Sequence, residues 1–544
     1  MVAAMPSASP CSAHGCGKML RTMPSRRQVL NLSLGLLGTS SLPAALTSAY
    51  AADTSNDAPR QALVIGNSRY ANSPLANPVN DATAIAKSLT ELGFACQLLT
   101  DATLQDMAAA VRSHGEKLSR LKAVGLFYYA GHGAQMGWRN YLVPVDATLS
   151  SLEDVPRQTL ELNSLLLALK KAANPMNVII LDACRDNPFG TRVPLEQKGL
   201  SQFDAPMGSL LSYATAPGNT ASDGEGANGL FTENLLREMR VPGAKLEDVF
   251  KRVRLKVRLQ SKGQQIPWES TSLEEDFYFT RTPGQLAEAS EAQKNALFAE
   301  EAAAWSAIQN ANTPEPFSNY LARYPNGKFS QLAQVQLDRL LKKQGEKRVE
   351  ATATENNPFT LGSTKAVGTY TVGDAYAFEL RDALSGVVQK AYQEVVSEVA
   401  ETQIVFNNGS LVLDLIGNET KSENPRFLSP AQLFPAEYSV GTKWSTQFGW
   451  RKGDGIASVM ALEMKVVGRE PFRTPAGEFN AFKVSGSGRV QGGSFWTVNY
   501  WIDPERCLRP LQFEMSTNGG SGKRAFSIAD RIVLVRYAQK SAKS

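Results

Sequence analysis

The sequence predicts an α/β fold with a mostly parallel sheet flanked by helices, followed by a helical connector and a C-terminal antiparallel β-domain. Three observations support this prediction. Between residues 60 and 282, short apolar runs alternate with longer stretches of helical periodicity. Residues 286–345 are rich in Ala, Glu, Gln and Leu without strand signals, whereas residues 359–540 show alternating residues separated by turn signals. Strand–helix alternation with continuous apolar strands is typical of a parallel sheet covered on both faces.

The elements of the first region follow from its apolar pattern. Short apolar runs predict buried strands, and stretches with apolar residues every three or four positions predict helices. The predicted strands are 62–66, 94–99, 123–130, 177–183 and 209–215, and the predicted helices are 78–92, 103–120, 162–172 and 229–239.

A basic stretch at 250–262 carries six Lys and Arg residues, which could suggest nucleic acid or lipid binding. Val249, Phe250, Val253 and Val257 also form an apolar stripe at helical spacing. We therefore interpret this stretch as a packed helix with a basic, exposed face.

The rest of the chain divides into a connector, a linker and a β-domain. The connector, residues 286–345, reads as a helix pair broken at Pro314, Pro316 and 325–327, and residues 346–358 form a polar linker. Residues 359–540 predict a β-sandwich or open barrel. The pieces "RTPAGEFNAFKV" and "YWIDPERCLRPLQFEM" resemble uncharacterised envelope β-domains with lipoprotein-carrier-like folds. This resemblance implies either a scaffold or a binding site for an envelope ligand or partner.

The first 51 residues have the features of an export signal. Paired Arg26 and Arg27 precede an apolar stretch at 29–46, and an A-x-A site stands at 49–51. The segment resembles a bacterial twin-arginine signal, the alternative being a general secretory signal. No later stretch has the length and apolarity of a membrane span. We expect a mature protein that has no transmembrane span and is periplasmic or extracellular.

Composition argues against nucleic acid as a partner. The chain has 57 basic and 52 acidic residues, but four basic and no acidic residues lie in the predicted signal, so the remainder is almost neutral. Behind the signal remain Cys96, Cys184 and Cys507. This odd number leaves at least one thiol unpaired or paired between chains in an oxidising compartment, as a nucleophile requires.

Two motifs place a histidine and a cysteine at comparable positions. In "LFYYAGHGAQMGW", His132 follows an apolar strand by two residues, and in "VIILDACRDNPFG", Cys184 stands where another strand stops. Because the carboxyl ends of neighbouring parallel strands meet at one edge, we expect both side chains there. A nearby histidine favours the thiolate of a cysteine, which is the reactive form. We interpret the two residues as one catalytic pair, although each alone could be structural.

The glycines beside His132 suggest a second part of the site. Gly131 and Gly133 leave the backbone free to turn, so the amide of Gly133 can point at a developing oxyanion. Together with the amide of Cys184 it would form an oxyanion hole.

Residues 60–280 resemble the caspase/metacaspase clan of cysteine endopeptidases. "YYAGHG" is similar to the clan's histidine motif and "LDACRDNPF" to its cysteine motif, while residues 211–236 and 265–279 resemble the small-subunit portion of bacterial members. The order of the pair, with the histidine about 50 residues before the cysteine, is that of caspases. The resemblance implies a caspase-like fold and peptide-bond cleavage through Cys184 and His132. It implies no metal or cofactor and leaves calcium dependence open.

The same resemblance points to specificity. Metacaspases and paracaspases have an aspartate at the position of Asp182 and prefer Arg or Lys, whereas caspases that cut after aspartate have glutamine there. A buried carboxylate suits a guanidinium. Asp81 resembles a second acidic wall of this pocket, and Asp223 is a third candidate. Their alternatives are a helix-start carboxylate for Asp81, a backbone cap for Asp182 and a turn residue for Asp223.

Two further alternatives concern processing and function. The Gly- and Pro-rich stretch after Cys184 contains Arg192 and Lys198. Our hypothesis is that one of these two candidates is a self-cleavage point, the alternative being an uncut surface loop. The whole chain is predicted to be a cysteine endopeptidase acting on a protein or peptide. The rival interpretation is a catalytically silent, caspase-like scaffold that presents the β-domain to an envelope partner.

Overall fold

The computed structural model describes residues 54–184, 199–216, 226–282, 291–349, 356–422, 427–428, 431–451, 457–490, 494–519 and 526–540. These residues all belong to one unit, residues 53–544. The predicted export signal lies outside the described residues, as do Arg192, Lys198 and Asp223.

The first region is a mostly parallel sheet with the order β2-β1-β3-β6-β7-β8. The first five strands in this order are parallel and β8 is antiparallel to β7. A short β4–β5 extension pairs with the end of β3. The strands are β1 (Arg60–Gly66), β2 (Ala95–Thr100), β3 (Val124–Met136), β4 (Arg139–Leu142), β5 (Leu160–Glu161), β6 (Asn177–Cys184), β7 (Ser209–Tyr213) and β8 (Trp268–Thr271).

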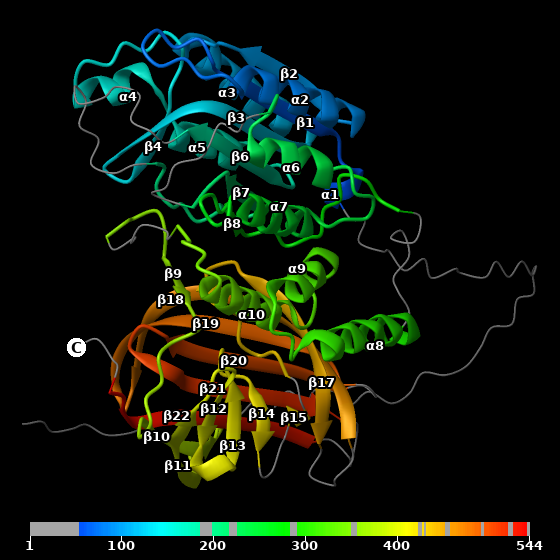
Figure 1. Ribbon diagram of the computed structural model, residues 1–544, viewed down its shortest axis with the longest axis vertical. Helices are drawn as coiled ribbons and strands as arrows, with labels where there is room; N and C mark the ends of the chain where they lie inside the picture. Colours follow the sequence, from blue (N-terminus) through cyan, green and yellow to red (C-terminus); the bar gives the residue numbers. More distant parts are fainter. Residues whose placement is uncertain are drawn as a thin grey trace, which may run out of the picture. The chain divides into compact units, whose positions relative to one another are not determined.

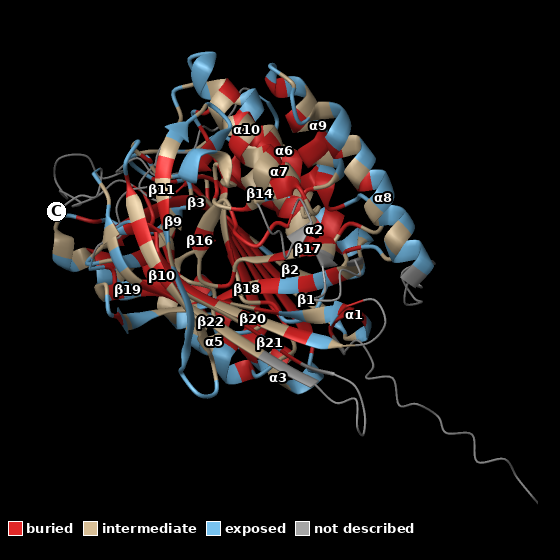
Figure 2. Cartoon of the chain, turned by 90° about the horizontal axis from the view of Figure 1, so that it is seen from below, coloured by how far each residue is buried: buried red, intermediate tan, exposed pale blue. Residues whose placement is uncertain are grey.

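Helices cover both faces of this sheet (Figure 1), as the continuous apolar strands predict. One core cluster joins the sheet to α2, α6 and α7, and the other joins it to α3 and α5. Buried positions run along α6 and α7 (Figure 2). The helices are α1 (Thr54–Asp57), α2 (Pro78–Glu91), α3 (Leu104–Leu121), α4 (Val155–Gln158), α5 (Leu162–Ala172), α6 (Leu230–Glu238) and α7 (Leu246–Gln260).

The sequence prediction was wrong about the end of β3. The strand continues beyond residue 130 to Met136, because its last residues leave β6 and pair antiparallel with β4. His132 therefore lies inside a strand, at the residue where β3 changes partner.

Helix α7 confirms the predicted apolar stripe but not the predicted basic, exposed face. Val249, Phe250, Val253 and Val257 are buried. The cations are largely paired: Arg252 forms an ion pair with Glu238, Arg254 with Glu269, and Arg258 with Asp338 and Glu346. The side chain of Arg258 is only 4% exposed. Acidic residues outside the helix thus pair with its cations, which the sequence of the helix itself does not reveal.

The connector contains three helices where a helix pair was expected. They are α8 (Glu291–Ile308), α9 (Pro314–Arg323) and α10 (Ser330–Lys343). Pro314 begins α9, at a position where the missing N–H costs no hydrogen bond. Trp305 of α8, Phe317 of α9 and Leu337 of α10 share one core cluster with Leu255 of α7.

The C-terminal region is a large antiparallel sheet, as predicted. Twelve strands follow the order β14-β13-β12-β11-β10-β22-β21-β20-β19-β18-β17-β15, and β9 pairs with β16 separately. The strands are β9 (Ser363–Lys365), β10 (Ala375–Asp382), β11 (Val388–Val399), β12 (Gln403–Phe406), β13 (Leu411–Asp414), β14 (Glu419–Ser422), β15 (Phe427–Leu428), β16 (Glu437–Ser439), β17 (Lys443–Arg451), β18 (Ala457–Thr474), β19 (Gly477–Val490), β20 (Phe495–Asp503), β21 (Cys507–Gly519) and β22 (Phe526–Ala538).

Candidate active site

The candidate site lies at the carboxyl edge of the parallel sheet. Strands β3 and β6 are neighbours, and their parallel register ends with His132 opposite Cys184. Adjacent strands lie about 4.8 Å apart, so the two backbones are close at this edge. The expected juxtaposition of the two chain positions is therefore present in the backbone.

The ring of His132 is held in a defined orientation. His132 is 2% exposed, and its Nε2 lies 2.7 Å from the carbonyl oxygen of Ser73. A carbonyl oxygen can only accept, so Nε2 must carry the proton that it donates. This bond fixes the tautomer and leaves Nδ1 as the nitrogen that exchanges a proton.

Two tyrosines that the sequence analysis missed hold the backbone of His132. The amide of His132 donates to the hydroxyl of Tyr70 (3.0 Å), and the hydroxyl of Tyr129 donates to the carbonyl of His132 (2.7 Å). Both hydroxyls also lie within 3.0 Å of the carbonyl oxygen of Val143. Tyr129 belongs to the histidine motif "YYAGHG", so its position was a usable signal. Tyr70 and Ser73 lie in the loop after β1, where no periodicity marks them.

The flanking glycines are needed for close packing, not for the predicted turn. Gly131 has a φ of +152°, and a Cβ there would lie 2.5 Å from the Tyr70 hydroxyl. A Cβ on Gly133 would lie 2.9 Å from Cδ2 of Leu200. Both residues are part of β3, so the chain passes through this motif without turning.

Asp182 contacts the buried hydroxyl of Tyr128, and the charge of Asp81 also acts on this hydroxyl. Asp182 accepts a hydrogen bond from Thr232 (2.7 Å) and one from Tyr128 (3.3 Å). Asp81 is 4% exposed and accepts from the amide of Gly229, at the start of α6. Burial, and then the charges of Asp182 and Asp81, raise the pKa of Tyr128. The charges of two carboxylates, one on β6 and one on α2, thus affect the same tyrosine hydroxyl near the carboxyl edge of the sheet.

His114, the other histidine among the described residues, has a structural environment. It lies on α3, is 2% exposed, and its Nε2 has no partner among the described residues. Burial, and to a smaller extent Lys117, lower the pKa of His114 to about 4.

This pKa predicts acid destabilisation. Below pH 6.5 the unfolded chain binds a proton at His114, whereas the folded chain binds it only near pH 4. The free energy of unfolding is therefore highest above pH 6.5 and falls as the pH drops from 6.5 towards 4. Between pH 7.5 and 5 the expected loss is about 2 kcal/mol. Urea unfolding at both pH values should show a smaller loss for His114→Gln by this amount. An identical loss in both proteins would contradict the prediction.

Neither a metal-ligand cluster nor a helix suited to crossing a membrane is found in the described part of the chain. No group of three or more His, Cys, Asp and Glu side chains there could hold a metal ion. No described helix combines the length and apolarity needed to cross a membrane.

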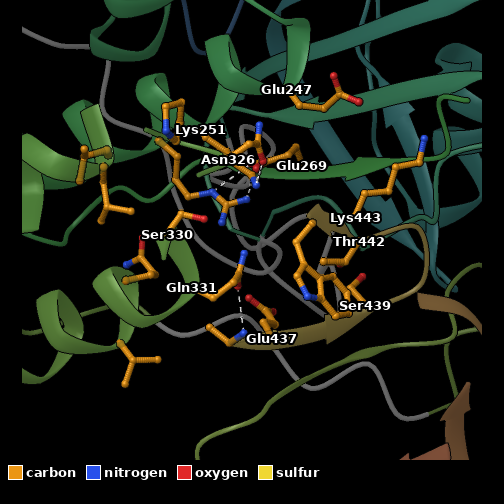
Figure 3. A pocket seen from close by; sticks show the side chains of 18 of the residues that line it. Glu247, Lys251, Glu269, Asn326, Ser330, Gln331, Glu437, Ser439, Thr442 and Lys443 are labelled. Atoms are coloured by element: carbon orange, nitrogen blue, oxygen red, sulfur yellow. Dashed lines mark hydrogen bonds and ion pairs between the residues drawn. The ribbon is translucent and has the colours of Figure 1, made fainter. Parts of the chain in front are cut away.

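The described residues that line a cavity of about 640 Å³ (Figure 3) do not include His132, Asp182 or Asp81. Residues from α7, α10 and β17 line it. Two of its cations have partners within the protein: Arg254 pairs with Glu269, and Lys251 donates to Asn326. We assign no ligand to the cavity.

A parallel sheet covered by helices, with histidine and cysteine in register at its carboxyl edge, is the arrangement that the resemblance to the caspase clan implies. Residues 59–278 match the family model of the caspase domain. This part of the chain is therefore similar to caspase domains, and we refer to residues 59–278 as the caspase domain after the model that they match.

Two curated relatives are similar to part of this chain. The mucosa-associated lymphoid tissue lymphoma translocation protein 1 of Homo sapiens is 30% identical over 179 residues, which cover 32% of this chain and 21% of the relative. Its Mus musculus homologue gives the same values. The chain thus spans about a fifth of the length of these relatives. The crystal structure of caspase-1 from Spodoptera frugiperda aligns with 42% of this chain and 94% of its own, at 16% identity and a TM-score of 0.33.

Proposed function

We propose that the caspase domain is a cysteine endopeptidase that cleaves after Arg or Lys, with Cys184 as nucleophile and His132 as acid and base. The observation that supports this most is the register of the two residues on neighbouring parallel strands. In this proposal the first 51 residues export the protein, and no metal or cofactor takes part in the chemistry.

The reaction follows from the orientation of His132. Nδ1 of His132 takes the thiol proton of Cys184, the thiolate attacks the scissile carbonyl carbon, and the oxyanion is stabilised by the amides of Gly133 and Cys184. The carbon–nitrogen bond breaks, and Nδ1 gives this proton to the leaving amine, which leaves a thioester. Nδ1 then takes a proton from water, the resulting hydroxide attacks the thioester carbon, and the carbon–sulfur bond breaks. This step releases the acid and restores the thiolate beside protonated His132. Throughout, Nε2 keeps its hydrogen bond to Ser73.

The charge near Tyr128 supports the specificity. Asp182 and Asp81 act on the same buried hydroxyl, and a substrate cation would neutralise this acidic region. Asp223, a third candidate for the pocket, lies outside the described residues.

Hydrolysis of matched fluorogenic peptides tests the proposal. The peptides differ only in the residue before the reporter, which is Arg, Lys or Asp, and are assayed with and without calcium. We expect Arg and Lys peptides to be preferred by about 100-fold or more. Preference for Asp would reject the role of the carboxylates, and no hydrolysis of any peptide would favour the silent scaffold. The intact mass of the same sample shows whether the chain is cut at Arg192 or Lys198.

A further inference from the structure

A short segment of the C-terminal region is bound to the caspase domain. We call residues 357–361 the clamp segment. It binds the stretch 202–204, which lies downstream of Cys184 and before β7. Four hydrogen bonds and one ring contact join the two stretches. They are Asn357 Nδ2 to the Gln202 carbonyl (2.8 Å), the Asp204 amide to the Phe359 carbonyl (2.9 Å), Thr360 Oγ1 to Asp204 Oδ1 (2.8 Å), the Leu361 amide to Asp204 Oδ2 (2.8 Å), and the stacked rings of Phe203 and Phe359 (4.5 Å between centroids).

The other end of this stretch contacts strands β4 and β3 near His132. The amide of Ser201 donates to Oδ1 of Asn140 (2.7 Å), and Nδ2 of Asn140 donates back to the Ser201 carbonyl (2.9 Å). Asn140 belongs to β4 and is fully buried. Leu200 lies against Gly133, since a Cβ there would be 2.9 Å from its Cδ2. Residues 200–204 thus connect the clamp segment with the strand that carries His132.

The stretch depends on these contacts for its order. Residues 200–204 have no helix or strand, yet Leu200, Ser201, Gln202 and Phe203 are at most 3% exposed. Buried backbone groups outside regular structure need partners from elsewhere. Here Asn140 supplies partners at one end and the clamp segment supplies them at the other.

We infer that the clamp segment is a positioning element for catalysis: through residues 200–204 it fixes Gly133 and His132, so the peptidase depends on a part of the chain outside the caspase domain. This inference rests on the proposed function for its kinetic consequence, but not for its structural one. It also implies that, after a cut at Arg192 or Lys198, residues 200–204 keep their hydrogen bonds to Asn140 at one end and to the clamp segment at the other.

Hydrogen exchange and kinetics of Asn357→Ala/Phe359→Ala in the full chain test the inference. We expect amides in 199–206 and also in 132–142 to exchange at least about tenfold faster than in the wild type. We expect kcat on Arg peptides to fall by about 10- to 100-fold, with KM changed less than about threefold, because the contacts of the clamp segment given above are to residues 202–204 and not to Asp182 or Thr232. The matched control is Val367→Ala, an exposed position in the same region, which should behave as the wild type.

Thr360→Val provides a milder variant that removes the Oγ1 hydrogen bonds to Asp204 and from the Gly362 amide and leaves Asn357 and Phe359 unchanged. It should show the same faster exchange and lower kcat to a smaller extent. The inference can therefore be tested even if the double variant misfolds. Faster exchange confined to 199–206 and 357–361, with 132–142 unchanged, would overturn the inference. If the wild type hydrolyses no peptide, the proposed function fails, while exchange at 132–142 still decides this one.

Discussion

Cys184→Ala is expected to lower kcat/KM by at least about 10⁴-fold, and His132→Ala by about 10²- to 10⁴-fold. The first change removes the nucleophile, and the second removes the group that protonates the leaving amine. Since the two residues act as one unit, the double variant should be no slower than Cys184→Ala alone. Steady-state hydrolysis of an Arg peptide by the three variants measures these effects.

Alkylation of individual cysteines supplies an independent measurement. Burial raises the pKa of Cys96 and raises that of Cys507 to about 12, so these thiols should react slowly with iodoacetamide at neutral pH. Cys184 should react fastest in peptide maps of the wild type and much more slowly in His132→Ala. His114→Gln is the matched histidine control and should keep wild-type hydrolysis. Undiminished hydrolysis by His132→Ala would refute the pair.

The parallel sheet and the placement of the site residues near strand ends could be predicted from local patterns. Apolar strands with little polar interruption predicted a parallel sheet, and the positions of His132 and Cys184 near strand ends placed them at one edge. The adjacency of β3 and β6 was an additional assumption, which the register confirms. The extension of β3 could not be predicted, because it depends on pairing with β4, a partner in tertiary structure with no strong strand signal of its own.

The supporting residues of the site were beyond sequence reasoning for a related reason. Ser73 acts through its backbone carbonyl, which every residue type possesses, so its identity carries no signal. Tyr70 reaches His132 from a loop 62 residues earlier in the chain. The same limit applies to α7. Its sequence predicts exposed cations, but these cations pair with Glu238, Glu269 and Glu346, which lie outside the helix. Apolar periodicity reports burial against a core, but not which polar groups meet.

Asp182→Asn is expected to lower kcat/KM for Arg peptides by about 30- to 1000-fold, which corresponds to about 2–4 kcal/mol for the loss of a partly buried charge pair. The asparagine can still accept the hydrogen bonds from Thr232 and Tyr128, so the variant removes charge with little change of shape. Peptides with a neutral residue before the reporter should be affected much less. Asp81→Asn should act in the same direction, because Asp81 approaches Tyr128 from α2.

Glu91→Gln is the matched control, because it removes one negative charge from the other end of α2, where Glu91 pairs with Arg240 at the surface. It should leave every peptide unaffected. The rate at which iodoacetamide modifies Cys184 should also be unchanged in Asp182→Asn, since this reagent does not use the acidic region. A uniform loss on Arg, Asp and neutral peptides would make Asp182 a structural residue. A loss confined to cationic peptides, with normal alkylation, would separate recognition of the substrate from the chemistry of Cys184 and His132.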